Sequence, residues 1–240
     1  MVLLKSISLL FLTLFAQFVF SAQLPTGLTP SELTTLIRVI SFGNVTRVMR
    51  SAEAYPTFPG LKLAIETPLV PSGSLSELGN GSASLPMVIP APRLNITKGL
   101  GMGLEVSLAI STQSITKTMG TEGVLAKWTY LEEKEAFLTS SIFASYTRLN
   151  GFTNTFNGNE FEAGILASKD YVRLKPYIGF GILLANATVT KAICINEQTQ
   201  TALTPHLFIG TEIELPMTIT FQLDLNQLVP SASFSLGYHF

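Results

Sequence analysis

Apolar and polar residues alternate without a break along the last ten residues, Ser231–Phe240. One phase holds Ala232, Phe234, Leu236, Tyr238 and Phe240, and the other holds Ser, Gly and His. A period of two predicts a β-strand with one apolar and one polar face. The chain stops on an aromatic ring, although chain ends are usually polar and frayed. We therefore expect this end to be an ordered strand of a sheet.

The same alternation recurs earlier in the chain. Five further segments show it clearly: Leu61–Glu66, Leu100–Ile110, Val172–Ile182, Leu203–Glu214 and Met217–Asn226. Four segments show it less cleanly: Pro86–Ile96, Met119–Tyr130, Ala136–Leu149 and Glu160–Ala167. The sum, with the tail, is ten strands, and eight to twelve remain possible. We predict an all-β fold with a closed antiparallel β-barrel.

The connections between these strands differ in length at the two ends of the barrel. Short ones are expected near 97–99, 131–135, 168–170 and 215–216. Mostly longer ones, rich in Ser, Thr, Asn and Gly, are expected near 71–85, 111–118, 150–159, 185–202 and 227–230. An even strand number with short turns at one end and longer loops at the other is typical of a transmembrane barrel.

Composition supports a membrane location for this barrel. Charged residues make up 13% of the chain, against about 25% in soluble domains. Beyond residue 22 no run of about 18 apolar residues occurs, so no transmembrane helix is predicted. Closure of the sheet satisfies every backbone group where lipid offers no partner. Trp128, Tyr130, Tyr238 and Phe240 fall at strand ends, where aromatic rings favour the membrane interface.

The C-terminal pattern resembles the last strand of Gram-negative outer-membrane β-barrels. In that class a terminal Phe, preceded by aromatic or apolar residues at alternate positions, serves as the assembly signal, and Phe234, Leu236, Tyr238 and Phe240 match it. The resemblance is to the class as a whole, with no narrower family. It implies location in the cell outer membrane, contact with its lipid and with the barrel-assembly machinery, and a periplasmic C-terminus.

The N-terminal part divides into two segments before the predicted barrel, 60–240. Residues 1–22 are typical of a secretory signal peptide, with cleavage after Ser21 or Ala22 both open. Residues 23–59 are predicted to be helical and then irregular. Thr29, Pro30 and Glu32 form a capping box ahead of Leu33, Leu36, Ile37 and Ile40 at helical spacing. This helix is expected to be a plug or a periplasmic latch packed on the barrel, or merely to cover the barrel base.

The inward phase of the strands carries charges of both signs. The predicted lumen residues are Lys62, Glu66, Arg93, Glu105, Lys127, Glu162, Arg173, Lys175, Glu212, Glu214 and Asp224. A barrel of about ten strands has an interior that side chains largely fill. We predict a structural membrane protein with a filled lumen, or a narrow solute or ion channel lined by these charges.

Two other functions are kept as alternatives. His206 and Asp224 are expected to face inward on adjacent strands, within reach of each other. A His oriented by a carboxylate can act as a general base, so an outer-membrane hydrolase is one alternative. The ten-stranded omptin proteases resemble this architecture, but their set of several catalytic acids is not matched and no nucleophile motif is present. A soluble secreted barrel would instead bind an apolar ligand on an inward apolar face.

Several classes of function find no support in the composition. One Cys and two His cannot form a Cys/His zinc site, and no metal or cofactor is predicted. The formal net charge of −1 shifts to −2 once Lys5 leaves with the signal segment. Such a balance provides no basic patch for nucleic acid.

Overall fold

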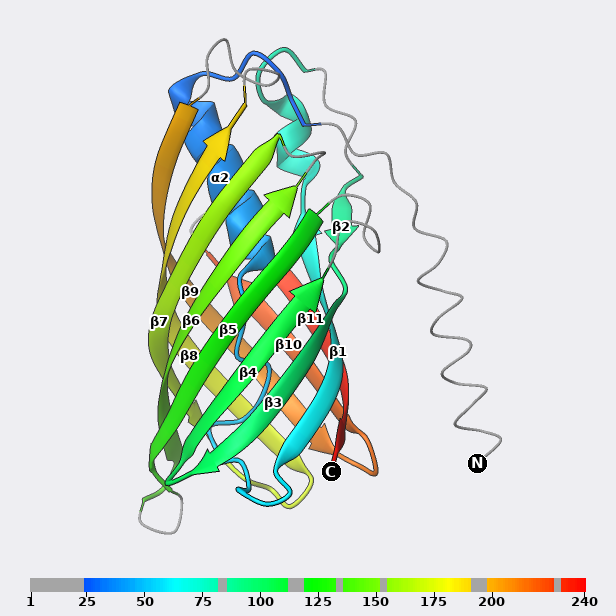
Figure 1. Ribbon diagram of the computed structural model, residues 1–240, viewed down its shortest axis with the longest axis vertical. Coiled ribbons are helices and arrows are strands. Elements are labelled where there is room, and N and C mark those ends of the chain that lie inside the picture. The colour runs from blue at the N-terminus through cyan, green and yellow to red at the C-terminus, as the bar shows by residue number, and fades with distance from the viewer. Residues whose placement is uncertain are drawn as a thin grey trace, which may run out of the picture.

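The computed structural model describes residues 24–81, 86–111, 119–132, 136–151, 155–190, 198–226 and 230–240. The predicted signal peptide, residues 1–22, lies outside these ranges. The described residues form one α-helix, one 3-10 helix and a tall barrel of tilted strands (Figure 1). The elements are α2 (Pro30–Asn44), β1 (Leu61–Pro71), the 3-10 helix η1 (Gly73–Glu77), β2 (Val88–Pro90), β3 (Arg93–Gly101), β4 (Leu104–Ser111), β5 (Met119–Leu131), β6 (Thr139–Gly151), β7 (Phe156–Ser168), β8 (Leu174–Val189), β9 (Gln198–Glu214), β10 (Thr218–Leu225) and β11 (Pro230–His239).

Ten of the described strands close into a ring of antiparallel neighbours. Each strand from β3 to β11 pairs with the next, and β1 pairs with both β3 and β11. Leu63 lies opposite Tyr238 and Leu69 lies opposite Ala232 at this seam. The short β2 pairs only with the end of β1. The predicted fold class is therefore confirmed, with one additional short strand.

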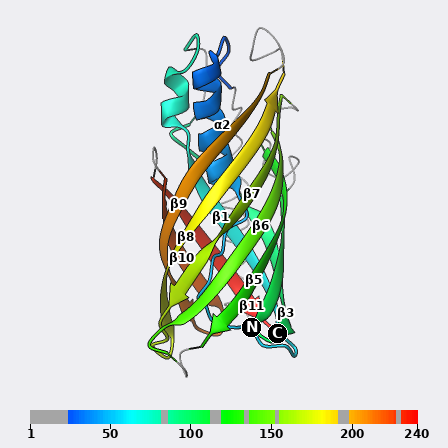
Figure 2. The ribbon, with the colours of Figure 1, turned by 90° about the vertical axis from the view of Figure 1, so that its left-hand side faces the viewer.

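The two ends of the barrel differ, and we name them by their connections. The turn end carries the short hairpin turns and the C-terminus, and the loop end carries α2 and η1 (Figures 1 and 2). The turn between β9 and β10 falls at 215–217, as predicted. Strands β8 and β9 are the longest of the described strands, with 16 and 17 residues, and they rise well beyond β10 at the loop end.

The outer face of the barrel is apolar. Leu, Ile, Val and Phe side chains of the strands point outward and are about half exposed; for example, Ile165 is 57% exposed and Leu223 is 59% exposed. On β8 the outward apolar positions extend from Leu174 to Leu184. At a rise of about 3.3 Å per residue and a tilt of about 40°, this belt is about 25 Å tall, the height of a transmembrane barrel's apolar band.

Aromatic side chains border this belt at the turn end. The rings of Trp128 and Tyr130 lie 6.3 Å apart, and those of Tyr238 and Phe240 lie 5.0 Å apart. All four side chains are exposed on the outside of the barrel. This position suits rings that prefer the boundary between lipid and water.

One predicted turn was wrong. The sequence analysis placed it at 97–99, before a strand at Leu100–Ile110, but β3 continues to Gly101 and the chain turns at Met102–Gly103. Backbone φ angles of +93° at Gly101 and +77° at Gly103 form the turn, because glycine tolerates this left-handed region. Leu100 and Leu104 both point outward, so the apolar alternation runs through the turn without marking it.

Two predicted loops were too long. The expected connections at 150–159 and 185–202 shrink to residues 152–155 and 190–197, because β6 to β9 continue beyond the apolar belt. Their outward side chains there are Asn and Thr: the hydroxyls of Thr188 and Thr199 lie 2.8 Å apart, and Asn186 Nδ2 lies 3.4 Å from Thr201 Oγ1. Because the outward residues at these strand ends are polar, apolar and polar residues no longer alternate there, and the sequence does not indicate a strand.

The helix begins as predicted, and it lies inside the barrel. Thr29 caps α2 with its side chain, and Glu32 completes the capping box. Figures 1 and 2 show α2 within the loop end, and from Asn44 the chain descends the interior to β1 at the turn end. Residues 41–52 are all buried. The helix therefore plugs the lumen; the alternatives, that it latches or covers the barrel at the end that carries the C-terminus, are wrong. No helix among the described residues is long and apolar enough to cross a membrane.

Candidate functional site

Most of the predicted lumen residues do point inward. Nine of the eleven are buried: Lys62, Glu66, Arg93, Glu105, Lys127, Glu162, Lys175, Glu212 and Asp224. Glu214 is half-buried at the turn end. Arg173 lies elsewhere, because β8 begins only at Leu174 and Arg173 occupies the exposed hairpin turn before it. The expectation that Arg173 lines the lumen was therefore wrong.

The loop end of the lumen is apolar. Leu33, Leu36, Ile37 and Ile40 of α2 are at most 1% exposed and belong to one cluster with inward residues of β6 to β9. That cluster also includes Leu24 and Leu28 before the helix and Leu75 of η1. Burial of such side chains contributes about 1.5–3 kcal/mol each, so this cluster anchors the plug helix.

Two arginines hold the C-terminal end of α2. Arg47 donates to the carbonyl of Phe42 (2.5 Å), and Arg93 of β3 donates to the carbonyls of Asn44 (3.1 Å) and Val45 (2.9 Å). These carbonyls carry the negative end of the helix dipole, which cations stabilise. Arg93 also pairs with Glu66 at 2.9 Å. Arg93 of the barrel wall and Arg47 of the chain after α2 therefore cap the C-terminal end of the helix together.

His206 joins two carboxylates beside the plug. Its Nδ1 lies 2.5 Å from Glu162 Oε1, and its Nε2 lies 2.8 Å from Asp224 Oδ1. Asp224 Oδ2 in turn accepts from Arg47 at 2.5 Å. The ring of Phe42 packs edge-on against the imidazole with centroids 5.0 Å apart. The predicted His206–Asp224 contact is present, one diagonal step apart in the β9–β10 register.

The descending segment, Val45–Tyr55, binds the wall mainly through its backbone. Its amides donate to wall oxygens, and its carbonyls accept from wall side chains. These contacts are Thr46 N to Thr147 Oγ1 (2.8 Å), Ser51 N to Glu212 Oε2 (2.9 Å), Ala52 N to Ser168 Oγ (2.9 Å), Lys127 Nζ to Ser51 O (2.7 Å) and Glu53 O (2.9 Å), and Thr129 Oγ1 to Ala52 O (2.7 Å). Five strands contribute to holding it, with the Arg93 contact to the Val45 carbonyl included.

A second arginine of the segment anchors its lower part. Arg50 Nη1 lies 2.9 Å from Glu105 Oε2, and Glu105 Oε1 lies 3.5 Å from Lys127 Nζ. The Arg50 guanidinium stacks over the ring of Tyr55 at 4.4 Å. Burial raises the pKa of Tyr55 to about 12, so its phenol stays protonated.

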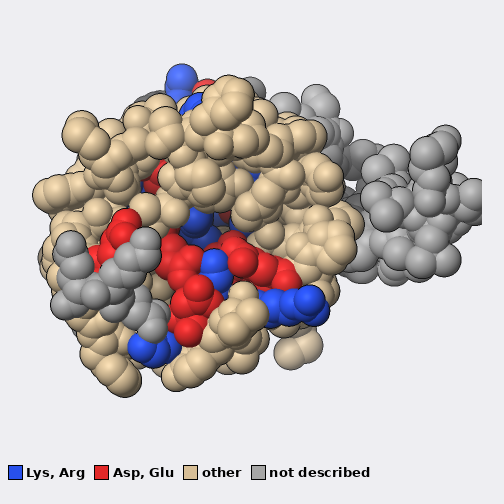
Figure 3. All heavy atoms as spheres, turned by 90° about the horizontal axis from the view of Figure 1, so that it is seen from below, with Lys and Arg blue, Asp and Glu red and all other residues tan. Residues whose placement is uncertain are grey.

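The turn end closes with charged side chains. Figure 3 shows acidic and basic residues gathered in this opening. Lys175 Nζ lies 2.6 Å from Glu53 Oε2 and 2.8 Å from Glu214 Oε1. Burial raises the pKa of Glu53, although the Lys175 ammonium opposes the rise. This cluster therefore ties the end of the threaded segment to β8 and β9.

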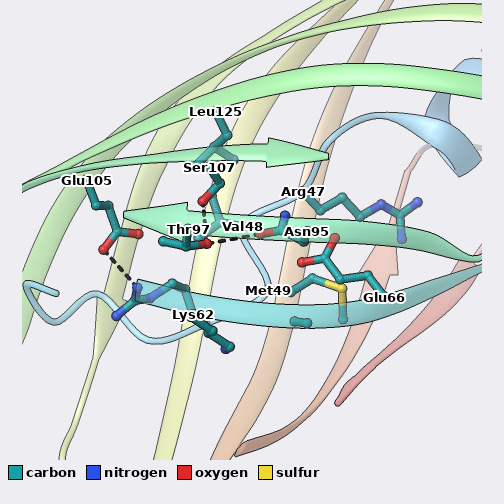
Figure 4. Close-up of a pocket in the computed structure, with 12 residues that line it drawn as sticks. Arg47, Val48, Met49, Lys62, Glu66, Asn95, Thr97, Glu105, Ser107 and Leu125 are labelled. Carbon is teal, nitrogen blue, oxygen red and sulfur yellow. Dashed lines mark hydrogen bonds and ion pairs between the residues drawn. The ribbon is translucent and has the colours of Figure 1, made fainter. Parts of the chain in front are cut away.

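A small cavity lies between the segment and the wall. Figure 4 shows a cavity among Arg47, Lys62, Glu66, Asn95 and Glu105. Its volume is about 10 Å³, which is about enough for one water molecule. This cavity is too small for an organic solute.

The arrangement gives no support to the hydrolase alternative. His206 is 1% exposed and Asp224 is fully buried, and both imidazole nitrogens already contact carboxylates. A general base must reach its substrate. No group of His, Cys, Asp and Glu side chains suited to a metal ion occurs in the described part of the chain. The apolar faces of the strands point outward, opposite to what an internal apolar ligand requires.

Sequence reasoning missed several residues of this site. Arg47, Arg50 and Glu53 belong to an irregular segment without a period, and Glu160 was not counted among the inward charges. Glu160 is 1% exposed, neither of its carboxylate oxygens makes a hydrogen bond among the described atoms, and the Ser41 hydroxyl of α2 lies near it. Side chains two residues apart in a strand point to the same face, so the inward position of Glu162 would have predicted that Glu160 also points inward.

No known protein family and no curated protein matches this sequence. Among solved structures, it is similar to the N-terminal β-barrel domain of Pseudomonas aeruginosa OprF, with 11% identity over 75% of this chain and 97% of that chain, at a TM-score of 0.33. It is also similar to the KdgM porin (10% identity, 75% of this chain, 98% of that chain, TM-score 0.37) and to Ail of Yersinia pestis (10%, 74%, 93%, 0.29). Such low TM-scores carry no weight for function.

Proposed function

We propose that this chain is an integral protein of the Gram-negative outer membrane whose barrel is closed by its own N-terminal segment. Support for the membrane location comes from the outward apolar belt, its aromatic border and the closed ring of strands. The lipid of that membrane is then the partner of the outer face. With the C-terminus periplasmic, the loop end and α2 face the cell exterior.

One observation carries the choice between a structural protein and a channel. Residues 41–52 are buried along the lumen axis, and the wall binds their backbone from five strands. An open pathway would require this segment to leave or to shift. We therefore favour a structural role, with a lumen closed to solutes, over a narrow open channel.

The membrane location is tested by fractionation and heat-dependent gel mobility. We expect the protein in the outer-membrane fraction, with faster migration before boiling than after. Recovery in the soluble periplasmic or secreted fraction would contradict the proposal.

The closed lumen is tested in planar bilayers with a locked plug. A Cβ at Gly43 would lie 2.9 Å from Val70 Cβ of β1, which is shorter than the 3.5–4.5 Å of a disulfide, so a shift of α2 by about half an ångström away from β1 would bring the pair into the disulfide range. Gly43→Cys with Val70→Cys, in a Cys194→Ser background, should therefore join α2 to the wall. We expect no conductance steps from the wild type or from the oxidised variant. Steady conductance in both would overturn the closed state.

A further inference from the structure

The lumen contacts the descending segment, Val45–Tyr55, as a receptor contacts an extended peptide. Backbone amides and carbonyls of Thr46, Ser51, Ala52 and Glu53 meet oxygen and nitrogen atoms of the wall, as described above. In peptide-binding proteins, main-chain hydrogen bonds of this kind supply affinity, and pockets for side chains supply specificity. The wall groups are side chains rather than the edge of a sheet.

The lumen also contains an apolar pocket for side chains of the segment. The side chains of Val48 and Ala52 are 3% and 0% exposed, and they form one cluster with inward residues of the wall. Those wall residues are Leu125, Phe143, Leu166, Tyr177 and Phe208. Edge-on contacts between the rings of Phe143, Phe208 and Tyr177 fix the shape of this pocket.

Charge provides a second determinant. Arg47 meets Asp224 at 2.5 Å, and Arg50 meets Glu105 at 2.9 Å. The arginines are three residues apart on an extended chain, and Val48 enters the apolar pocket between them. All these wall residues belong to β4 to β10, so their positions do not depend on the covalent link to β1.

We propose that the lumen is a binding site for an extended polypeptide with two arginines spaced as Arg47 and Arg50, which this chain occupies with its own segment. The covalent connection at Thr57–Gly60 is then a tether and not a condition for binding. This inference deepens the proposed function, because it states which ligand class closes the lumen.

The experiment separates the segment from the barrel in the full-length chain. A specific protease site is inserted after Phe58, which is 92% exposed in the turn before β1. The folded protein is cut, unfolded in urea and refolded into detergent with an excess of a fluorescent synthetic peptide of residues 24–58. The uncut protein refolded in parallel shows whether the barrel itself forms and inserts into lipid vesicles, which tests the proposed function separately.

We expect the labelled peptide to enter the refolded barrel in proportion to its excess. A peptide methylated on the amide nitrogens of Thr46, Ser51 and Ala52 should compete at least tenfold less well, because three main-chain donors are lost. Methylation at Thr57, in the exposed turn, is the matched control and should change little. A peptide with Arg47→Ala and Arg50→Ala should also compete poorly.

Three outcomes would overturn the proposal. The cut barrel refolds but takes up no peptide, or it accepts methylated and unmodified peptides equally, or it fails to refold while the uncut protein succeeds. The first two exclude recognition of the backbone, and the third shows that the segment acts only when it is covalently attached.

Discussion

The Arg47 guanidinium lies 2.5 Å from the Asp224 carboxylate, with both side chains fully buried. One residue belongs to the threaded segment and the other to β10, so the pair joins the plug to the wall. Arg47 also donates to Ser233 of β11 at 2.6 Å and to the last turn of α2. This single side chain thus connects the helix, the lumen charges and β11, one of the two strands of the seam.

Arg47→Ala should loosen the plug and destabilise the barrel. Removing one partner of a buried ion pair leaves an uncompensated charge and costs about 3–5 kcal/mol. We expect a lower urea midpoint and brief conductance bursts in planar bilayers, where the wild type is silent. Arg148→Ala is the control, because Arg148 is exposed on the outside of β6. Equal stability of the two variants would argue against this role of Arg47.

Glu160→Gln and Glu162→Gln should have different effects. The Glu160 carboxylate has no hydrogen bond among the described atoms, so a neutral amide of the same shape should leave stability unchanged or raise it. Glu162 contacts His206 at 2.5 Å, and its change should cost about 1–3 kcal/mol. Urea unfolding followed by gel mobility provides the comparison. A loss for Glu160→Gln as large as that for Glu162→Gln would disprove the distinction.

The capping box should make the plug helix sensitive to acid. Amide and hydroxyl hydrogen bonds from Thr29, and an amide from Gly79, lower the pKa of Glu32 below its ordinary value of 4.5. The stabilisation is therefore present above that value and is lost as the pH falls through the lowered pKa. Hydrogen exchange of the α2 amides should accelerate in acid for the wild type, and Glu32→Gln should show less of this change. Thr29→Ala should cost about 1 kcal/mol of helix stability.

The C-terminal Phe should matter for assembly more than for stability. We infer that Phe240, with Phe234, Leu236 and Tyr238, is read by the barrel-assembly machinery. Its side chain is 53% exposed, although its amide donates to Leu61 O at 2.8 Å. Phe240→Ala should lower the amount of folded protein in cells but leave refolding in detergent nearly unchanged. Phe137→Ala, at an exposed aromatic in a turn, is the control. A similar loss for both variants in cells would contradict the signal.

Alternation predicted the barrel because burial follows it directly. Leu223 and Asp224 are neighbours in sequence, yet one is 59% exposed and the other is fully buried. The capping box likewise predicted the start of α2 at Pro30. Both features depend on residues that are close together in the chain, so the sequence alone predicts them.

The path of residues 45–59 was not predictable in this way. This segment has neither helix nor strand, and its backbone partners are side chains about 40 to 160 residues distant along the chain. In the sequence, Arg47 and Arg50 do not differ from ordinary surface arginines. Their partners, Asp224 of β10 and Glu105 of β4, come close to them only in the folded barrel. Contacts of this kind depend on closure of the barrel, which no local pattern encodes.

The seam between β1 and β11 has a consequence for the order of assembly. The enclosed segment precedes β1 in the chain, and β11, the other partner in the seam, is the last strand to be synthesised. A ring that closed empty would have to be threaded afterwards by a folded helix. If β1 pairs with β11 while the segment is already in place, this threading step is avoided. The segment is then enclosed by the ring of strands and can leave only along the barrel axis.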